Sequence, residues 1–286
     1  MSDERSVPVE QLDARVHQPA SFVDHEDAPQ ADGTVRGYLH STETVGSVNG
    51  PGVRYTAYLS GCPLRCLYCH NPDTWNMRMG EHVDVETVLA DIGKYARFIS
   101  VSGGGLTVSG GEPLLQPRFV TELFRGVKLR HGMHTALDTA GSLGDRAPDE
   151  LLDLTDLVLL DIKSGKPDQY RRVTSWELQP TLDVARRVAA RAATTTTRMW
   201  IRYVLVPGLT DDPDNVAAVA DVAASLDGVE RTEIMPYHEY GAAKYDALGW
   251  TYPLADVEPP SKEQVKACLL YTSPSPRDGT KDLVCR

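Results

Sequence analysis

Short apolar runs separated by stretches of helical periodicity constrain the fold of this chain more than any other feature of its sequence. The runs are rich in Val, Ile, Leu and Tyr, and the clearest are Arg54–Leu59, Leu106–Ser109, Thr135–Asp138, Leu157–Asp161, Met199–Val206 and Thr232–Met235. The best helical pattern between them places one face at Val85, Val88, Leu89, Ile92, Ala96 and Ile99. Strands that alternate with helices indicate βαβ units and a mostly parallel sheet. About six units are too few for a closed eight-stranded barrel, so we predict an α/β fold with a partial, open β/α barrel.

Polar residues follow most of these predicted strands. Catalytic groups gather at the carboxyl ends of parallel strands, and the segments found there are Ser60–Cys62, Ser109–Glu112, Asp138–Thr139, Asp161–Lys163 and Pro236–His238. We therefore expect them to meet at one mouth of the sheet. Arg202 lies inside an apolar run, and a charge that faces the interior needs a partner, so we expect it to pair with a carboxylate at a neighbouring strand end.

Composition excludes several classes of protein. The chain has 286 residues, of which 41% are hydrophobic, so it can bury a full core. Its formal net charge of −11 argues against nucleic-acid binding. No stretch approaches the ~18–20 apolar residues of a membrane span, and the polar, acidic start is unlike a secretory signal. We expect a cytoplasmic, enzyme-sized protein with neither nucleic-acid nor membrane partners.

The two ends of the chain differ from the middle. Residues 1–36 carry eight acids and three arginines without apolar periodicity, and we interpret them as an acidic, disordered extension. Residues 37–267 form the predicted catalytic domain. Residues 268–286 resemble a translated sequencing adapter, because a common transposase adapter encodes Cys268 to Asp278. We therefore expect the native sequence to stop near Ala267, inside a helix that begins around Ser261.

Three of the five cysteines lie within eight residues, as Cys62, Cys66 and Cys69 in C-x3-C-x2-C order. Thiols this close together cannot cross-link a fold of this size, and they suit a soft metal centre. Three thiolates can hold three corners of a [4Fe–4S] cube, which leaves one iron open to a small molecule. A zinc site with His70 as fourth ligand and a cluster of inert buried thiols are the alternatives.

The cysteine motif, with Tyr68 before its third cysteine, resembles that of the radical S-adenosylmethionine (SAM) enzymes. Further sequence blocks, which follow one another in order over residues 37–267, resemble more specifically those of the glycyl-radical enzyme activases of the pyruvate formate-lyase type. These blocks are NGPGVRY (Asn49–Tyr55), Gly61–Trp75, SGGGLTVSGGEPLLQ (Ser102–Gln116), LDTAG (Leu137–Gly141), DLVLLDIK (Asp156–Lys163), Trp200–Asp212 and EIMPYHEYGAAKY (Glu233–Tyr245). The resemblance implies a partial β/α barrel of the radical SAM type.

The resemblance also implies which residues hold the cofactors. The three cysteines would ligate a [4Fe–4S] cluster, and SAM would chelate its open iron. The implied SAM contacts are Tyr68 and His70 beside the adenine, Gly110, Gly111 and Glu112 at the methionyl amine, Asp161, Ile162 and Lys163 after one strand, and His238 at the ribose. Glycines agree with this chemistry, since they let backbone approach a ligand closely.

A monovalent cation site beside SAM is a further implication, with Asp138, Thr139 and Asp161 around it. Several of these residues have structural alternatives. Ser109–Glu112 could be an ordinary tight turn, Lys163 a solvated lysine and His238 a satisfied loop histidine. The two aspartates could be helix N-caps.

The implied activity is reductive cleavage of SAM to a 5′-deoxyadenosyl radical, which abstracts hydrogen from a backbone glycine of pyruvate formate-lyase. The implied partners are that enzyme and a flavodoxin or ferredoxin reductant, and we expect a monomer. One alternative is the same chemistry on another target, such as anaerobic ribonucleotide reductase or a different glycyl-radical enzyme. A non-catalytic zinc or iron–sulfur module is a second alternative, and it predicts no SAM binding.

Overall fold

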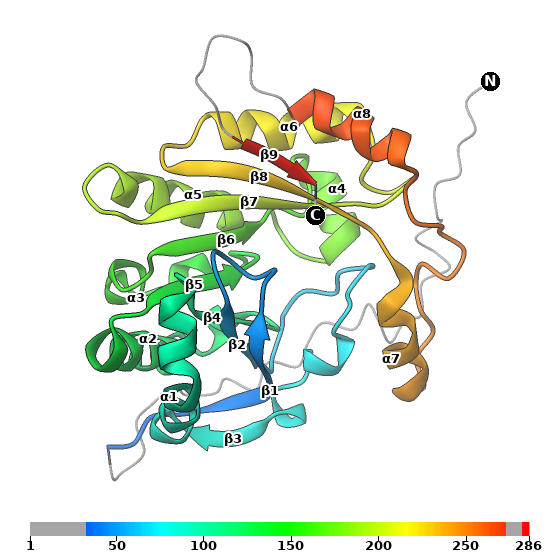
Figure 1. Ribbon diagram of the computed structural model, residues 1–286. Coiled ribbons are helices and arrows are strands. Elements are labelled where there is room, and N and C mark those ends of the chain that lie inside the picture. The colour runs from blue at the N-terminus through cyan, green and yellow to red at the C-terminus, as the bar shows by residue number, and fades with distance from the viewer. Residues whose placement is uncertain (1–32, 273–281, 286) are drawn as a thin grey trace, which may run out of the picture.

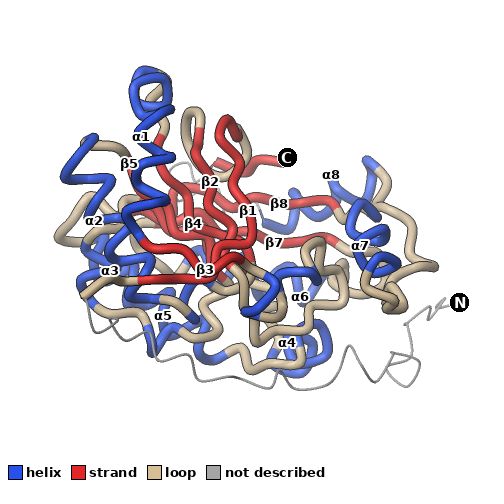
Figure 2. Tube along the Cα trace, turned by 90° about the horizontal axis from the view of Figure 1, so that it is seen from below, coloured by secondary structure: helices blue, strands red, loops and turns tan. Residues whose placement is uncertain are grey.

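The protein forms a single curved sheet with most of its helices packed along the outer side (Figures 1 and 2). The computed structural model describes residues 33–272 and 282–285. The order of strands in the sheet is β3-β1-β2-β4-β5-β6-β7-β8-β9. Their bounds are β1 Arg36–Gly46, β2 Arg54–Leu59, β3 Glu81–Asp84, β4 Gly105–Gly110, β5 His134–Thr139, β6 Leu157–Asp161, β7 Arg198–Leu205, β8 Val229–Pro236 and β9 Asp282–Cys285.

Strands β2 to β8, apart from β3, are the six predicted strands, and each pairs in parallel with its neighbour. The edge strands β3 and β9 lie at opposite ends of the order, so the sheet stays open. The prediction of an α/β fold with a partial barrel is therefore confirmed. Beyond it, β1 pairs antiparallel with both β2 and β3, and β9 adds a parallel strand beside β8.

Helices connect the parallel strands and bury one face against the sheet. Their bounds are α1 Val85–Val101, α2 Pro117–His131, α3 Asp149–Asp153, α4 Pro167–Thr174, α5 Gln179–Ala192, α6 Pro213–Ala224, α7 Ala242–Ala247 and α8 Lys262–Thr272. The buried residues of α1 are the six that its periodicity predicts. Asp84 caps the start of α1, because its carboxylate accepts the Thr87 N–H at 2.7 Å and so satisfies one of the free N–H groups of the first turn.

Two apolar clusters divide the interior. The larger lies between the sheet and helices such as α1, α2 and α5. The smaller cluster contains Leu64, Leu67, Tyr68, Trp75 and Tyr245. It surrounds residues 61–75, which carry the three cysteines and are called the cysteine loop below. None of the helices that the structure describes is both long and apolar enough to span a bilayer.

The predicted terminal segments fall largely outside the described residues. Residues 1–32 of the acidic extension lie there, and β1 already begins at Arg36. Helix α8 begins at Lys262, close to the expected Ser261, and continues to Thr272. Residues 273–281 and 286 of the predicted adapter segment also lie outside the description. The boundary at residue 267 therefore stays a prediction.

Candidate active site

The parallel register brings the five predicted strand-end segments to the same edge of the sheet. Leu59 is paired with Gly110, Thr139 with Leu160, and Leu205 with Pro236. Side chains then meet across the edge: the Ser109 hydroxyl donates to Asp138 Oδ2 at 2.7 Å. The expectation of one common mouth is confirmed.

The cysteine loop follows β2 and is fixed on two sides. Gly61 has φ of +96°, a left-handed conformation that favours glycine, and its N–H donates to the Thr74 carbonyl at 2.6 Å. On the other side, the Arg65 N–H donates to the carbonyl of Thr174, at the end of α4, at 2.8 Å. The loop between these anchors therefore has a defined path.

The three predicted ligands are free thiols close to one another. Cys66 is buried, while Cys62 and Cys69 are half-buried. Burial raises the pKa of all three thiols, that of Cys66 to about 12, and repulsion from Cys66 and Cys69 adds to the increase at Cys62. Thiolates are the ligating form, so three of them need positive charge beside them, which a metal centre supplies.

The zinc alternative fits this geometry poorly. His70, its proposed fourth ligand, stacks on His238 with ring centroids 4.0 Å apart, and its Nε2 lies 3.2 Å from the His238 carbonyl. Burial, followed by repulsion from His238, lowers the pKa of His70 to about 4. Among the described residues, no three His, Cys, Asp or Glu side chains surround a point that could hold one ion. A cube does not need such convergence, because each thiolate binds its own iron.

Among the described residues, three predicted SAM contacts carry buried polar atoms without a hydrogen-bond partner. These atoms are the Tyr68 hydroxyl, Asp161 Oδ1 and His238 Nδ1, and the hydroxyls of Thr56, Ser60 and Tyr245 are further cases. Buried polar groups are nearly always paired, so the unpaired atoms on predicted ligand contacts need an explanation. A polar ligand between the cysteine loop and the ends of β6 and β8 would satisfy them. The residues present therefore fit SAM.

Lys163 and Asp161 form a buried ion pair beside the cysteine loop. Lys163 Nζ lies 2.7 Å from Asp161 Oδ2 and 5.8 Å from the ring centroid of Tyr68. Burial opposes the charge of Lys163, but attraction from Asp161, Tyr68 and Cys66 outweighs it and raises the pKa of the lysine. Lys163 is therefore not a solvated strand-end lysine. The side chain of Ile162 is fully buried in the larger core, and its N–H donates to the Arg202 carbonyl at 3.0 Å, so only its own carbonyl is left for a ligand contact.

The glycine that ends β4, Gly110, and the one that follows it, Gly111, are required by the fold itself. A Cβ on Gly110 would lie 2.3 Å from the Leu59 nitrogen, and one on Gly111 would lie 2.1 Å from the Gly61 carbonyl oxygen. Gly110 also has φ of +110°. Both glycines therefore let β4 approach β2 and the start of the cysteine loop. Their predicted contact with the SAM amine stays a prediction.

The side chain of Glu112 is occupied within the protein. Its carboxylate accepts the Thr139 hydroxyl at 2.5 Å and the N–H groups of Leu114 and Ala140 at 3.1 Å each. Burial raises the pKa of Glu112 to about 7, although these hydrogen bonds oppose the increase. Glu112 thus joins the ends of β4 and β5, and its predicted role at SAM stays a prediction.

Arg202 has the carboxylate partners that its position demands. Its Nη1 lies 3.3 Å from Asp138 Oδ2, at the end of β5, and its Nε lies 3.1 Å from Glu233 Oε2 on β8. The predicted pairing is confirmed. Burial raises the pKa of Asp138, and repulsion from Asp161 adds to this although Arg202 opposes it. A cation would relieve that repulsion, but the proposed site of Asp138, Thr139 and Asp161 stays a prediction.

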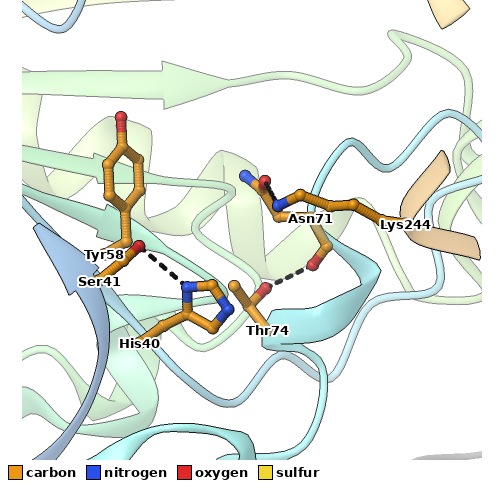
Figure 3. Close-up of a pocket in the computed structure, with 6 residues that line it drawn as sticks. All are labelled: His40, Ser41, Tyr58, Asn71, Thr74 and Lys244. Carbon is orange, nitrogen blue, oxygen red and sulfur yellow. Dashed lines mark hydrogen bonds between the residues drawn. The ribbon is translucent and has the colours of Figure 1, made fainter. Parts of the chain in front are cut away.

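A cavity of about 260 Å³ lies beside the cysteine loop and was not foreseen from the sequence. Figure 3 shows its lining, which comes from β1, β2, the segment after the cysteines, and α7: His40, Ser41, Tyr58, Asn71, Thr74 and Lys244. Lys244 Nζ donates to Asn71 Oδ1 at 2.8 Å and lies 3.0 Å from Asp73 Oδ2. Asp73 also lies 3.2 Å from His40 Nε2, so one carboxylate links opposite walls.

Comparison with known proteins decides the family. Residues 57–220 match the Radical SAM superfamily. The pyruvate formate-lyase-activating enzyme of Staphylococcus aureus (strain USA300) is 45% identical over 246 residues, which cover 84% of this chain and 96% of that enzyme. The chain belongs to the pyruvate formate-lyase-activating enzyme family of the radical SAM superfamily. In fold, a radical SAM methyltransferase from Sphaerobacter thermophilus aligns with a TM-score of 0.56 at 16% identity, over 91% of this chain and 75% of that one.

Membership establishes the cofactors as a [4Fe–4S] cluster and SAM, and the chain as a glycyl-radical enzyme activase. The alternative of a non-catalytic zinc or iron–sulfur module is therefore wrong. Cys62, Cys66 and Cys69 are the thiols available for the cluster. The orphaned atoms of Tyr68, Asp161 and His238 and the buried Lys163 are the groups that fit SAM.

Proposed function

We propose that this protein activates a pyruvate formate-lyase by removing a hydrogen atom from a backbone glycine of that enzyme. The observation that carries the proposal is the set of orphaned buried atoms on Tyr68, Asp161 and His238, next to the cysteine loop. The name of the Staphylococcus aureus relative supports the choice of target. When bound, the reduced cluster and SAM supply the 5′-deoxyadenosyl radical that takes the hydrogen atom.

The chain itself binds, orients and shields the reacting groups. Asp161 and Lys163 offer a carboxylate and an ammonium group for the polar ends of SAM. His70 stays neutral because its pKa is lowered to about 4, so its ring offers a flat, uncharged surface in the cysteine loop. The smaller apolar cluster excludes water around the cysteines.

The cavity beside the loop suits a segment of the partner chain. Its lining includes the ammonium of Lys244 and the hydroxyl of Ser41, which can exchange their present partners, Asn71 and His40, for peptide carbonyl and amide groups. It also adjoins Asn71, which follows the cysteine motif by two residues. We assign it to the chain that flanks the target glycine.

We further propose that the protein acts as a monomer in the cytoplasm, with a flavodoxin or ferredoxin as its reductant. A reducing compartment agrees with the three thiols of the cysteine motif, Cys62, Cys66 and Cys69, none of which is in a disulfide.

The test of the proposed target is anaerobic activation of pyruvate formate-lyase, followed by electron paramagnetic resonance of the glycyl radical. We expect a radical in proportion to 5′-deoxyadenosine formed, and none when the target glycine of the partner is replaced by alanine. If 5′-deoxyadenosine forms but pyruvate formate-lyase gains no radical, the enzyme acts on a different protein.

A further inference from the structure

Arg65 is a buried cation within the cysteine motif. It lies directly before Cys66 and is 8% exposed. In the part of the chain that the structure describes, no carboxylate forms an ion pair with its guanidinium. Its Nη1 donates to the carbonyls of Cys62 and Leu64 at 2.9 and 2.8 Å, and both acceptors are neutral. Burial of an unpaired charge is unfavourable, so this site needs a negative group.

Two other buried arginines have the compensating partners that Arg65 lacks among the described residues. Arg202 is matched by Asp138 and Glu233. Arg54 forms no ion pair within residues 33–272 either, but each of its nitrogens has a hydrogen-bond partner and the charge of Asp156 acts on it.

The guanidinium lies against the loop that carries the three cysteines. Arg65 directly precedes Cys66 in the sequence, and its Nη1 donates to the carbonyl of Cys62 at 2.9 Å. The ligating residues of a bound cluster are therefore the groups whose negative charge this guanidinium can balance.

The guanidinium is also held in place. Its Cζ lies 4.7 Å from the ring centroid of Trp75, as in a cation–π contact. Trp75 in turn stacks on Trp250 with centroids 5.3 Å apart and meets Tyr245 edge-on at 6.0 Å. With hydrogen bonds on one side and an aromatic surface on the other, the charge cannot turn away to solvent.

We propose that Arg65 is the fixed counter-charge of the iron–sulfur cluster and raises its reduction potential. This inference rests on the proposed function, since it requires a cluster on the three cysteines. One-electron reduction adds one negative charge to the cluster, and a nearby fixed cation stabilises the reduced form more than the oxidised form. Net charge, hydrogen bonds and exposure set the potentials of such clusters. Arg65 thus acts only through the position of its charge, and it takes no part in making or breaking bonds.

The test is a redox titration of the reconstituted holoprotein without SAM, followed by electron paramagnetic resonance of the reduced cluster. Arg65→Met removes the charge and keeps much of the side-chain length, and Arg65→Lys keeps the charge. At a fixed solution potential, we expect Arg65→Met to lower the reduced-to-oxidised ratio about tenfold, equivalent to ~59 mV for one electron. Arg65→Lys keeps a charge but loses the planar fork that stacks on Trp75, so its decrease should be clearly smaller than that of Arg65→Met.

An unchanged potential in Arg65→Met with a full cluster overturns the inference, as does an equal decrease in both variants. If Arg65→Met binds no cluster, the iron content of the two variants is compared instead. A cluster that is retained in Arg65→Lys supports the need for a positive charge at this position, whereas loss of the cluster from both variants overturns the inference. Failure of the proposed function is seen separately, because a wild-type protein that binds iron and sulfide but forms no 5′-deoxyadenosine still has a measurable potential.

Discussion

Replacement of Gly111 by alanine tests whether the residue that follows β4 holds the cysteine loop in position. The new Cβ would lie 2.1 Å from the Gly61 carbonyl oxygen, whereas ordinary contact begins at 3.4 Å. Both sides are backbone, so the two segments must separate by about 1.3 Å. Gly61 directly precedes Cys62, and it accepts the Glu112 N–H at 2.8 Å, so the displacement reaches the first cluster ligand. A misplacement of about 1 Å lowers a rate by roughly 100-fold, and we expect that loss in 5′-deoxyadenosine formation.

The assay measures iron content after anaerobic reconstitution, then the rate of 5′-deoxyadenosine formation with dithionite as reductant. Gly93→Ala is the matched control, because a Cβ there meets nothing closer than 3.9 Å. Alanine in place of this glycine in α1 should stabilise the fold by about 1 kcal/mol. A Gly111→Ala protein with full iron content and the wild-type rate would refute the reasoning.

Three further predictions concern other parts of the site. Arg202→Met leaves the carboxylates of Asp138 and Glu233 buried without their cation, so thermal or denaturant unfolding should show a loss of about 3–5 kcal/mol; a loss below 1 kcal/mol would contradict this. Tyr68→Phe removes a hydroxyl that has no partner, so it should leave stability unchanged yet weaken SAM binding about tenfold by calorimetry; reduced stability with normal binding would show that the hydroxyl serves the fold. Ser41→Trp should fill the cavity and suppress radical formation on the partner while 5′-deoxyadenosine formation without partner continues, with Ser41→Ala as control; normal activation by Ser41→Trp would exclude the cavity as the partner's site.

The parallel strands were predictable because they are buried on both faces. Such strands are continuous apolar runs, as in Leu157–Asp161, and their bounds follow closely from the sequence. The buried face of α1 was equally legible, since its apolar residues recur at helical spacing.

The antiparallel edge was not predictable by the same reasoning. Strand β1 is RGYLHSTETVG, which has mixed burial and no apolar run, and the edge strand β3 has only four residues. Their places depend on pairing with β2 and with each other, which local pattern does not encode.

The site was foreseen where its chemistry is compact in sequence. The cysteine spacing indicates the cluster, and the charge of Arg202 required the carboxylates that it has. The cavity depends on residues as distant as His40 and Lys244, each ordinary in its own context. The need for Gly111 arises from the approach of a second backbone, which no single segment reveals.

The most direct test of the account is SAM cleavage by the protein alone. The wild type and Cys66→Ala are reconstituted anaerobically with iron and sulfide, reduced with dithionite and supplied with SAM, and 5′-deoxyadenosine is quantified. The account predicts product from the wild type and none from Cys66→Ala, which lacks one cluster ligand. A wild-type protein with a fully loaded cluster and no 5′-deoxyadenosine would contradict it.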